Sequence, residues 1–214
     1  MRLRYIKGSI ENIQKHPLII QQPEQHKGRW NEIFGNQHPI HIEIGMGKGG
    51  FILAQARKNP DINYIGIEKF STVILRAVEK LEALEQPLKN LVLLRFDAWD
   101  ILDLFEHQEI ERIYLNFSDP WPREKQAKRR LIHLGYLNKY QQVLHKQGSI
   151  QFKTDNDTLF EFCLEEVKKS AFTMIKVTRD LHHSDYVADN IMTEYETKFV
   201  GLGKSINFIE LVNQ

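Results

Sequence analysis

Residues 39–50 read PIHIEIGMGKGG. A short apolar stretch, Ile40–Ile44, contains one acidic residue, Glu43, and leads directly into a cluster of glycines. An apolar run of this length, bounded by proline and glycine, predicts a buried β-strand. The residues that follow, Lys48–Lys58, have a helical pattern that Asn59-Pro60 ends. The stretch therefore predicts the first strand, turn and helix of an α/β fold.

The alternation of strand and helix continues along the chain. We expect further strands at Ile62–Ile67, Leu91–Phe96, Ile113–Phe117, Ser149–Lys153, Phe172–Val177 and Ile206–Val212. We expect helices near Ile10–Lys15, over Phe70–Leu84, Ala98–Phe105 and Glu124–His145, and after an N-cap at Asp157. Strands that alternate with helices indicate a parallel sheet, and such sheets bind ligands beyond the carboxyl ends of their strands.

Composition limits the class of protein. The chain has 214 residues, 42% hydrophobic and 27% charged, which is typical of a soluble globular protein. The net charge of +1 excludes a globally basic surface, so any nucleic-acid site must be a local patch. The single cysteine, Cys163, excludes an internal disulfide and a multi-cysteine zinc site. With no membrane-length apolar run and no apolar segment after the basic residues 1–7, we expect a cytoplasmic protein without a signal peptide.

Residues 1–38 have weak periodicity and are expected to form an N-terminal arm before a single domain at 39–214. We favour a leader that packs or frays, as chain termini commonly do. The alternative is a basic arm, with Arg2, Arg4 and Lys7 touching a polyanion.

Acidic residues stand at or just after the ends of the first five expected strands. They are Glu43, Glu68, Asp97, Asp119 and Asp155. Each alone is ordinary, because acidic side chains favour the positive end of a following helix. Together they would line the ligand-binding edge of a parallel sheet.

Glu43 helps to identify the ligand. A glycine turn such as Gly45–Gly50 lets a ligand approach the backbone closely, at Gly45 and Gly47 for example, and also opens dinucleotide-binding domains. A carboxylate before this turn repels a pyrophosphate and favours a cation that lacks phosphates. S-adenosylmethionine is such a cation. Glu68 then suits the ribose hydroxyls and Asp97 the adenine amino group.

A stiff corner follows the fourth expected strand. Residues 116–122 read NFSDPWP, and two prolines restrict the backbone around Asp119. Residues 123–130 read REKQAKRR, with five positive charges and one negative. A contact between these cations and a phosphate backbone would explain this run. The alternatives are a corner with its tryptophan in the core and a solvated helix face.

The sequence resembles the tRNA (guanine-N7)-methyltransferases. The resemblance is carried by Ile42–Gly50, Tyr64–Glu68, Tyr114–Pro122, Lys128–Leu131, Phe152–Asn156 and Asn190–Phe199, the last reading NIMTEYETKF. It implies a Rossmann-like class I methyltransferase fold, with a mostly parallel seven-stranded sheet and helices on both faces. It also implies S-adenosylmethionine as cofactor and transfer of its methyl group to N7 of a guanosine in the tRNA variable loop, giving 7-methylguanosine.

The resemblance also implies roles for individual residues. Cofactor contacts fall on the glycine turn and the strand-end acids, Glu43, Gly45, Gly47, Glu68, Asp97 and Asp119, with Asp119 also catalytic. Substrate contacts fall on Arg123, Asp155, Thr193, Glu194, Tyr195 and Glu196. The residues implied to face the RNA are Lys125, Lys128, Arg129 and Arg130. The chain departs from the family's pattern at three positions. The family commonly has lysine where this chain has Arg123, and often histidine where it has Gln126. Glu124 lowers the net positive charge of a stretch that is usually more basic.

Chemistry gives these residues a rationale. Guanine N7 has a lone pair and carries no proton, so methyl transfer needs no general base. We expect Asp119 to stabilise the positive charge that the purine gains, and Asp155 or Glu196 to accept hydrogen bonds from the guanine N1–H and amino group. Tyr195 can stack on the base or pack in the core.

Three other functions compete. A class I methyltransferase for a small molecule or protein would not need the basic run, and a nonenzymatic RNA-binding module would not need the strand-end acids. A nicotinamide-dependent oxidoreductase is disfavoured by Glu43. We expect no metal site, since His182-His183 with Asp185 has no matching second pair. The sequence is compatible with a monomer or a homodimer.

Overall fold

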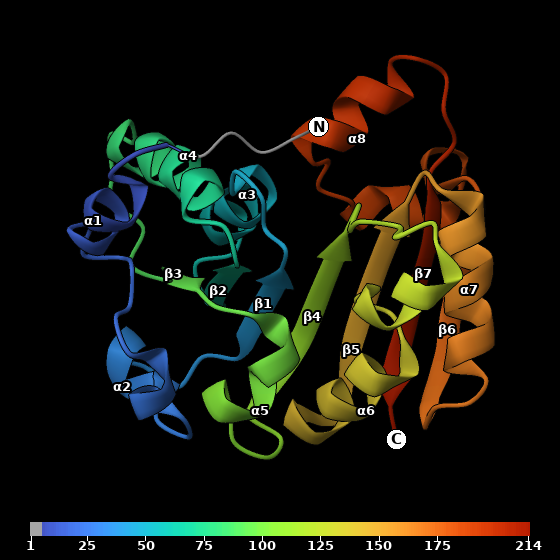
Figure 1. Ribbon diagram of the computed structural model, residues 1–214, viewed down its shortest axis with the longest axis horizontal. Coiled ribbons are helices and arrows are strands. Elements are labelled where there is room, and N and C mark those ends of the chain that lie inside the picture. Colours follow the sequence, from blue (N-terminus) through green and yellow to red (C-terminus); the bar gives the residue numbers. More distant parts are fainter. Residues whose placement is uncertain (1–5) are drawn as a thin grey trace. The chain divides into compact units, whose positions relative to one another are not determined.

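The computed structural model describes residues 6–214 (Figure 1). Within these residues, one seven-stranded sheet has the strand order β3-β2-β1-β4-β5-β7-β6. Its strands are β1 (Ile40–Ile44), β2 (Asn63–Glu68), β3 (Leu91–Arg95), β4 (Ile110–Asn116), β5 (Leu144–Thr154), β6 (Phe172–Thr178) and β7 (Asn207–Asn213). The predicted α/β fold with a mostly parallel sheet is confirmed. The chain divides into two units, Met1–Phe105 and Glu106–Gln214.

The first unit contains the parallel strands β1, β2 and β3. Every residue of β1 and β2 is buried, as expected for parallel strands that are covered on both faces. The helices α3 and α4 pack against β2. The helical segments of this unit are α1 (Ser9–Gln14), η1 (Pro23–His26), α2 (Trp30–Phe34), α3 (Gly50–Lys58), α4 (Ser71–Glu82), η2 (Ala98–Asp100) and α5 (Ile101–Leu104). Parallel pairing places the carboxyl ends of the three strands at one edge.

The described part of the N-terminal region packs into the first unit. Ile13, Ile19 and Trp30 are all buried, and α1 lies against α4. Ile19 bridges to Leu93 in β3, and the indole N–H of Trp30 donates to the carbonyl oxygen of Leu104 at 2.9 Å. Residues 6–38 therefore contribute to the core. Arg2 and Arg4, which carry the alternative of a basic arm, lie outside the described residues.

The second unit is a mixed sheet. The strand β4 pairs parallel with β5, whereas β7 lies antiparallel between β5 and β6. The helical segments of this unit are η3 (Glu124–Arg129), α6 (Leu134–Val143), α7 (Asp157–Val167), η4 (Leu181–His183), η5 (Asp185–Asp189) and α8 (Glu194–Val200). The carboxyl ends of β4 and β5 lead into the two segments that carry Asp119 and Asp155.

Two local predictions in this unit are wrong. One helix was expected over Glu124–His145, but the chain forms η3, becomes extended at Arg130 and His133, and starts α6 anew. The side chain of His133 caps α6 by accepting a hydrogen bond from the N–H of Gly135. The N-cap of α7 is Asn156 rather than Asp157, because the amide oxygen of Asn156 accepts from the N–H of Leu159 at 2.8 Å.

Candidate functional site

The glycine turn between β1 and α3 bends back over the end of β2. Gly45, Gly47 and Gly49 all have left-handed backbone angles, with φ of 72°, 56° and 73°. Glycine reaches these angles without the steric cost that a side chain imposes. The N–H groups of Gly45 and Met46 both donate to the carbonyl oxygen of Ile67, at 2.9 and 3.1 Å. The turn is thereby fixed at the carboxyl edge of the first unit.

Glu68 ties this turn to β2. Its carboxylate accepts hydrogen bonds from the backbone N–H groups of Gly47 at 3.2 Å, Lys69 at 2.8 Å and Phe70 at 3.1 Å. Two residues predicted to share the cofactor, Gly47 and Glu68, are thus in direct contact. In a dinucleotide-binding turn, backbone N–H groups face a pyrophosphate. Here the N–H of Gly47 faces a carboxylate, which disfavours a phosphate ligand.

Glu43 lies inside the first unit, 2% exposed, at the position of β1 that pairs with Gly66. Gly66 leaves no space for a side chain. A Cβ there would collide with the Sδ of Met46 in the glycine turn and lie 2.8 Å from Cδ2 of Leu93. Close packing behind the turn therefore fixes the backbone that follows Glu43.

Asp97 connects the ends of β2 and β3. Its side chain accepts from the N–H of Trp99 at 3.1 Å and forms an ion pair with Lys69. Two aromatic side chains stay exposed beside these acids, Phe70 at 49% and Trp99 at 44%. Exposed large apolar groups next to fixed carboxylates suit a ligand that has both a flat ring and hydrogen-bond donors.

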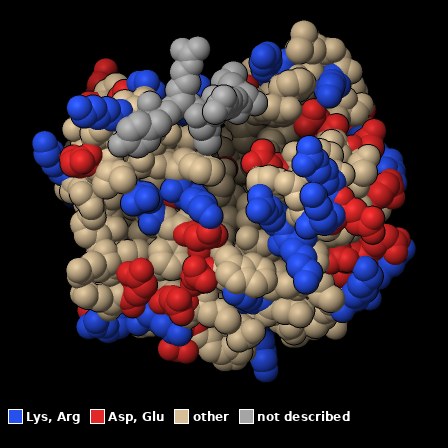
Figure 2. All heavy atoms as spheres, in the orientation of Figure 1, with Lys and Arg blue, Asp and Glu red and all other residues tan. Residues whose placement is uncertain are grey.

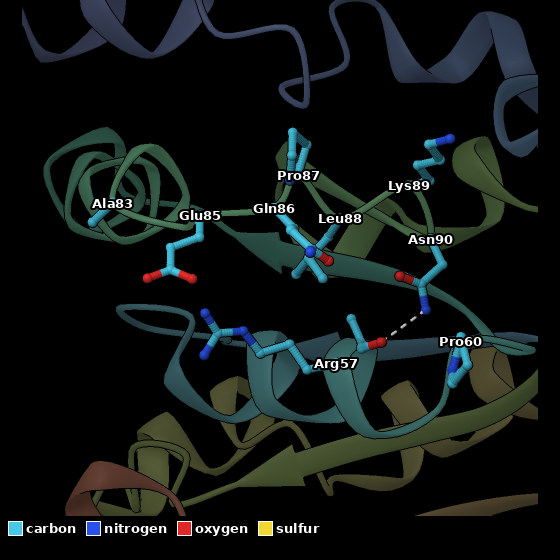
Figure 3. A pocket seen from close by; sticks show the side chains of 10 residues that line it. Arg57, Pro60, Ala83, Glu85, Gln86, Pro87, Leu88, Lys89 and Asn90 are labelled. Carbon is cyan, nitrogen blue, oxygen red and sulfur yellow. Dashed lines mark hydrogen bonds between the residues drawn. The ribbon is translucent and has the colours of Figure 1, made fainter.

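A separate pocket lies at the opposite end of α3, between that end and the segment after α4 (Figure 3). Arg57 and Glu85 border it, and Asn90 beside it donates to the carbonyl oxygen of Ala56 at 3.0 Å. None of the predicted site residues lines this pocket. The residues predicted for the cofactor therefore lie outside this pocket.

In the second unit, Asp119 lies in a strained corner. Phe117 and Trp121, two residues to either side of it, have φ of 50° and 42°. These left-handed angles cost bulky residues about 1 kcal/mol or more each, so the surroundings must hold them in place. The N–H of Phe117 donates to the carbonyl oxygen of Lys153 in β5 at 2.9 Å. Asp119 itself is exposed.

The basic residues after this corner differ in their exposure to solvent. Arg123, Lys125, Lys128 and Arg129 are exposed, and the guanidinium of Arg129 lies 5.0 Å from the ring centre of Trp121. Figure 2 shows Lys and Arg side chains gathered where Figure 1 draws the yellow-green segment between β4 and α6. Arg130 differs, because it is only 8% exposed and donates to the carbonyl oxygens of Pro120 and Trp121. The expectation that Arg130 faces RNA does not match this burial.

Asp155 and Tyr195 come together beyond β5. The Tyr195 hydroxyl donates to the Asp155 carboxylate at 3.4 Å, and Lys204 forms an ion pair with the same carboxylate at 3.0 Å. The hydrogen bond and charge of Asp155 raise the pKa of Lys204. The Tyr195 ring is 43% exposed and stacks on Phe199, with the ring centres 4.1 Å apart. This arrangement offers a carboxylate acceptor beside an exposed aromatic face.

Glu196 is fully buried rather than open to a ligand. One of its oxygens accepts from Lys153 at 2.6 Å and from the N–H of Thr193 at 3.2 Å. The other contacts His182 at 2.9 Å and accepts from Asn190 at 2.7 Å. Thr193 completes a capping box by accepting from the N–H of Glu196, and Glu194 is exposed in the first turn of α8. Glu196 therefore holds together the segment that carries Thr193 and Tyr195.

The sequence reasoning missed several residues around these sites. Lys69, Trp99, Lys153 and Asn190 received no role, and Phe70 was read only as part of a helix face. An aromatic residue two positions after a strand-end acid, as at Phe70 and Trp99, was an available signal. A lysine within an apolar strand was the corresponding signal at Lys153.

The remaining candidates are the histidine pair at 182–183 and the single cysteine. His182 contacts Glu196 and His183 contacts Asp180, and no metal-binding group of histidine, cysteine and acidic residues occurs among residues 6–214. Burial raises the pKa of the Cys163 thiol well above its usual range, so this cysteine is a poor nucleophile. Within the same range, no helix combines the length and apolar character needed to cross a membrane.

Solved structures of methyltransferases share this fold. One described as "Structure of an Antibiotic Related Methyltransferase" has a TM-score of 0.64 over 97% of this chain and 98% of that chain, at 20% identity. The 16S rRNA methyltransferase KamB has a TM-score of 0.61 over 87% of this chain and 92% of its own, at 9% identity. At such identities the likeness shows the fold alone.

Sequence comparisons are more specific. The family model Methyltransf_4, described as "Putative methyltransferase", matches residues 37–209. A tRNA (guanine-N(7)-)-methyltransferase of Lachnoclostridium phytofermentans is 56% identical over 207 residues, 97% of this chain and 96% of its own length. One from Bacillus cytotoxicus is 48% identical over 98% of this chain and 96% of its own length. The chain belongs to the tRNA (guanine-N(7)-)-methyltransferase family.

Proposed function

We propose that this protein transfers a methyl group from S-adenosylmethionine to N7 of a guanine in tRNA. The nucleotide is a guanosine of the variable loop, and the product is 7-methylguanosine. The observation that carries this proposal is the exposed Asp119 in a strained corner, followed by exposed basic residues, in a chain of this family. A base beside Asp119 and a phosphate backbone beside Lys125, Lys128 and Arg129 would use both features.

The first unit supplies acceptors that suit the methyl donor. Glu43, Glu68 and Asp97 lie at or beyond the carboxyl ends of their strands, and the glycine turn leaves bare backbone at Gly45 and Gly47. When bound, S-adenosylmethionine supplies an electrophilic methyl group on a sulfonium. We assign Glu68 to the ribose hydroxyls, Asp97 to the adenine amino group, and Glu43 to the electrostatic attraction of the cationic end.

The chemistry needs orientation and charge stabilisation rather than a base. The bond from sulfur to the methyl carbon breaks as the bond from N7 to that carbon forms, so the positive charge passes from sulfur to the purine. We assign Asp119 to the site where this charge develops, as a cofactor contact and as the catalytic carboxylate. Its stiff corner fixes the carboxylate in advance, which limits the reorganisation needed during transfer.

For the guanine, we assign the N1–H and the amino group to Asp155, and base stacking to Tyr195. Guanine donors would replace Lys204 as the partner of the Asp155 carboxylate. Arg123 and Glu194 are exposed and able to meet the nucleotide directly. Thr193 and Glu196 shape this segment through the capping box and the buried contacts of Glu196. We also propose that the enzyme works in the cytoplasm, where its substrate occurs.

The activity test uses purified protein, methyl-labelled S-adenosylmethionine and unmodified tRNA transcript. After digestion to nucleosides, we expect the label in 7-methylguanosine. A transcript with adenosine in place of the variable-loop guanosine is expected to remain unlabelled. Label in another nucleoside, in protein alone or in no product would contradict the proposal and favour one of the competing functions.

Asp119→Ala tests the catalytic assignment. We expect the rate of transfer to fall by about 100-fold or more, because the purine loses its stabilising charge. Asp61→Ala, an exposed carboxylate in the turn before β2, is the matched control and is expected to keep the wild-type rate. Because Asp119 is also assigned to the donor, the rate is measured at saturating S-adenosylmethionine, and equilibrium binding to Asp119→Ala verifies that the donor still binds. A folded variant that binds this donor and transfers methyl at the wild-type rate would exclude the catalytic role.

A further inference from the structure

The corner that carries Asp119 is held in a conformation that its own residues do not favour. Phe117 and Trp121 are bulky, and the left-handed angles of both are uncommon for such side chains. Proline at 120 and 122 restricts φ at those two positions but does not impose a positive φ on Trp121. Contacts from outside the corner must therefore stabilise it.

Arg130 provides such contacts. Its Nε donates to the carbonyl oxygen of Pro120 at 2.9 Å, and its Nη2 donates to the carbonyl oxygen of Trp121 at 3.0 Å. These carbonyls belong to the two residues that directly follow Asp119. One planar guanidinium thus holds two consecutive peptide groups at a fixed separation and orientation.

The guanidinium is also packed on its flat face. Its central carbon lies 4.3 Å from the ring centre of Phe162 in α7, and Arg130 is 8% exposed. Stacking on an aromatic ring suits arginine because the guanidinium is planar and weakly hydrated. The two carbonyl contacts and this ring therefore connect the corner to the helix α7.

The neighbouring cations differ from Arg130. Lys128 and Arg129 are exposed, and Arg129 lies over the ring of Trp121 rather than against the backbone of the corner. A phosphate of RNA can reach exposed cations, whereas a guanidinium that is 8% exposed and covered on one face by the ring of Phe162 is far less accessible to one.

We propose that Arg130 is a positioning residue for methyl transfer, which fixes the corner through the carbonyls of Pro120 and Trp121 and thereby orients Asp119. The proposal rests on the proposed function. Without the two hydrogen bonds from the planar guanidinium of Arg130, the corner relaxes toward ordinary backbone angles and the Asp119 carboxylate loses its orientation. The chemical step is affected, whereas the affinity for tRNA is not.

Arg130→Lys separates this role from RNA binding because it keeps the charge and removes the planar guanidinium. We expect kcat to fall on the order of 10- to 100-fold, as small misplacements of catalytic groups do. We expect the KM for tRNA to stay within about twofold of the wild-type value. The dependence of tRNA binding on salt concentration should also match the wild type, since no phosphate contact is lost.

Arg129→Gln is the matched comparison from the exposed neighbour. It is expected to raise the KM for tRNA and to lower the slope of log affinity against log salt by about 1. If Arg130→Gln, which removes the charge, weakens tRNA binding and lowers the salt slope as Arg129→Gln does, Arg130 is an RNA contact and the proposal is wrong. Unchanged kcat in Arg130→Lys also overturns it.

Fluorescence of Trp121 gives a readout that does not depend on activity. The protein has three tryptophans, and in a Trp99→Phe background only the fully buried Trp30 and the corner residue Trp121 remain. We expect Arg130→Lys to make Trp121 more accessible to acrylamide quenching. Unchanged quenching contradicts the positioning role of Arg130 whether or not the protein methylates tRNA. The labelling assay tests the methyl-transfer activity itself, so the failure of one proposal can be distinguished from the failure of the other.

Phe162→Leu covers the case in which Arg130→Lys does not fold. It leaves Arg130 intact and removes the ring on which the guanidinium stacks. We expect a smaller loss of kcat with increased quenching of Trp121, and the KM for tRNA should not change. Wild-type quenching and kcat in a folded Phe162→Leu would argue against the connection between α7 and the corner.

Discussion

At the scale of single residues, the buried ion pair of Lys153 and Glu196 shows what holds the segment that carries Thr193 and Tyr195 in place. Lys153 is 4% exposed and Glu196 fully buried, and Lys153 also donates to Asn190 and to the carbonyl oxygen of Ile191. A buried ion pair adds little net stability compared with an apolar pair. Removal of only one partner is costly, because the other charge then stays buried with neither an ion-pair partner nor water to solvate it.

Lys153→Met is therefore expected to destabilise the protein by about 3–5 kcal/mol, because the Glu196 carboxylate loses its buried cation. Adding Glu196→Gln should restore part of this loss, so the double variant costs less than the sum of the single variants. Urea unfolding measures each free energy. The control is Lys168→Met, whose exposed pair with Glu165 is worth less than about 1 kcal/mol. Equal costs for Lys153→Met and Lys168→Met would contradict this account.

At the scale of elements, β7 is central to the second unit because it pairs with both β5 and β6. Glu210 in β7 is 3% exposed and contacts Lys176 at 2.6 Å, Arg112 at 3.5 Å and Gln151 at 3.3 Å. Burial alone raises the pKa of Glu210, but the hydrogen bonds from Lys176 and Gln151 and the two positive charges outweigh it and lower the pKa. One carboxylate thus connects β4, β5, β6 and β7.

This shift predicts a pH dependence of stability. Because the folded pKa of Glu210 is lowered, its contribution is present above the unfolded-state value, about 4.3, and disappears as the pH falls through the folded value. Glu210→Gln should cost about 1–3 kcal/mol at pH 7, and the difference from wild type should shrink under acid. Urea unfolding across this pH range measures it. Glu111→Gln, at an exposed position of β4, is the control, and a Glu210→Gln cost that persists in acid would exclude the ionic explanation.

At the scale of the whole molecule, the chain consists of two units, and the described part of the N-terminal region completes the first. Trp30 is fully buried, lies 5.7 Å from the ring of Phe105 and donates to the carbonyl of Leu104. The beginning and the end of the first unit are therefore packed together. An N-terminal truncation removes core side chains rather than a loose arm.

Trp30→Ala is expected to destabilise the protein by about 3–5 kcal/mol, because it leaves a large cavity and an unpaired carbonyl. Removal of residues 1–38 should be more damaging and make the first unit sensitive to proteolysis. Thermal unfolding and limited proteolysis measure the two effects. Trp99→Ala, at a side chain that is 44% exposed, provides the comparison. A truncated chain with wild-type melting and protease resistance would show that this region is dispensable.

Local sequence patterns were sufficient to predict the position of most helices and strands. The strands β1, β3 and β6 begin at the expected residues, because each is a short stretch rich in apolar and β-branched residues that starts on an apolar one. The contact between Gly47 and Glu68 also follows from a glycine turn and an acid at the ends of adjacent parallel strands. The expected helix over Glu124–His145 failed because its apolar spacing gives no sign that Arg130 turns inward and His133 starts a new helix.

The sequence by itself determined the strand and helix alternation, the glycine turn, the acids after the strands and the family. These features depend on residues that are close in the chain, so their patterns are visible without coordinates. Only the tertiary structure decided which charged side chains are buried. It assigned Arg130 to the backbone of the corner and Lys153 to Glu196, and left Lys128 and Arg129 exposed. The reason is physical: the cost of burying a charge depends on partners that distant segments supply, and the identity of the residue does not encode them.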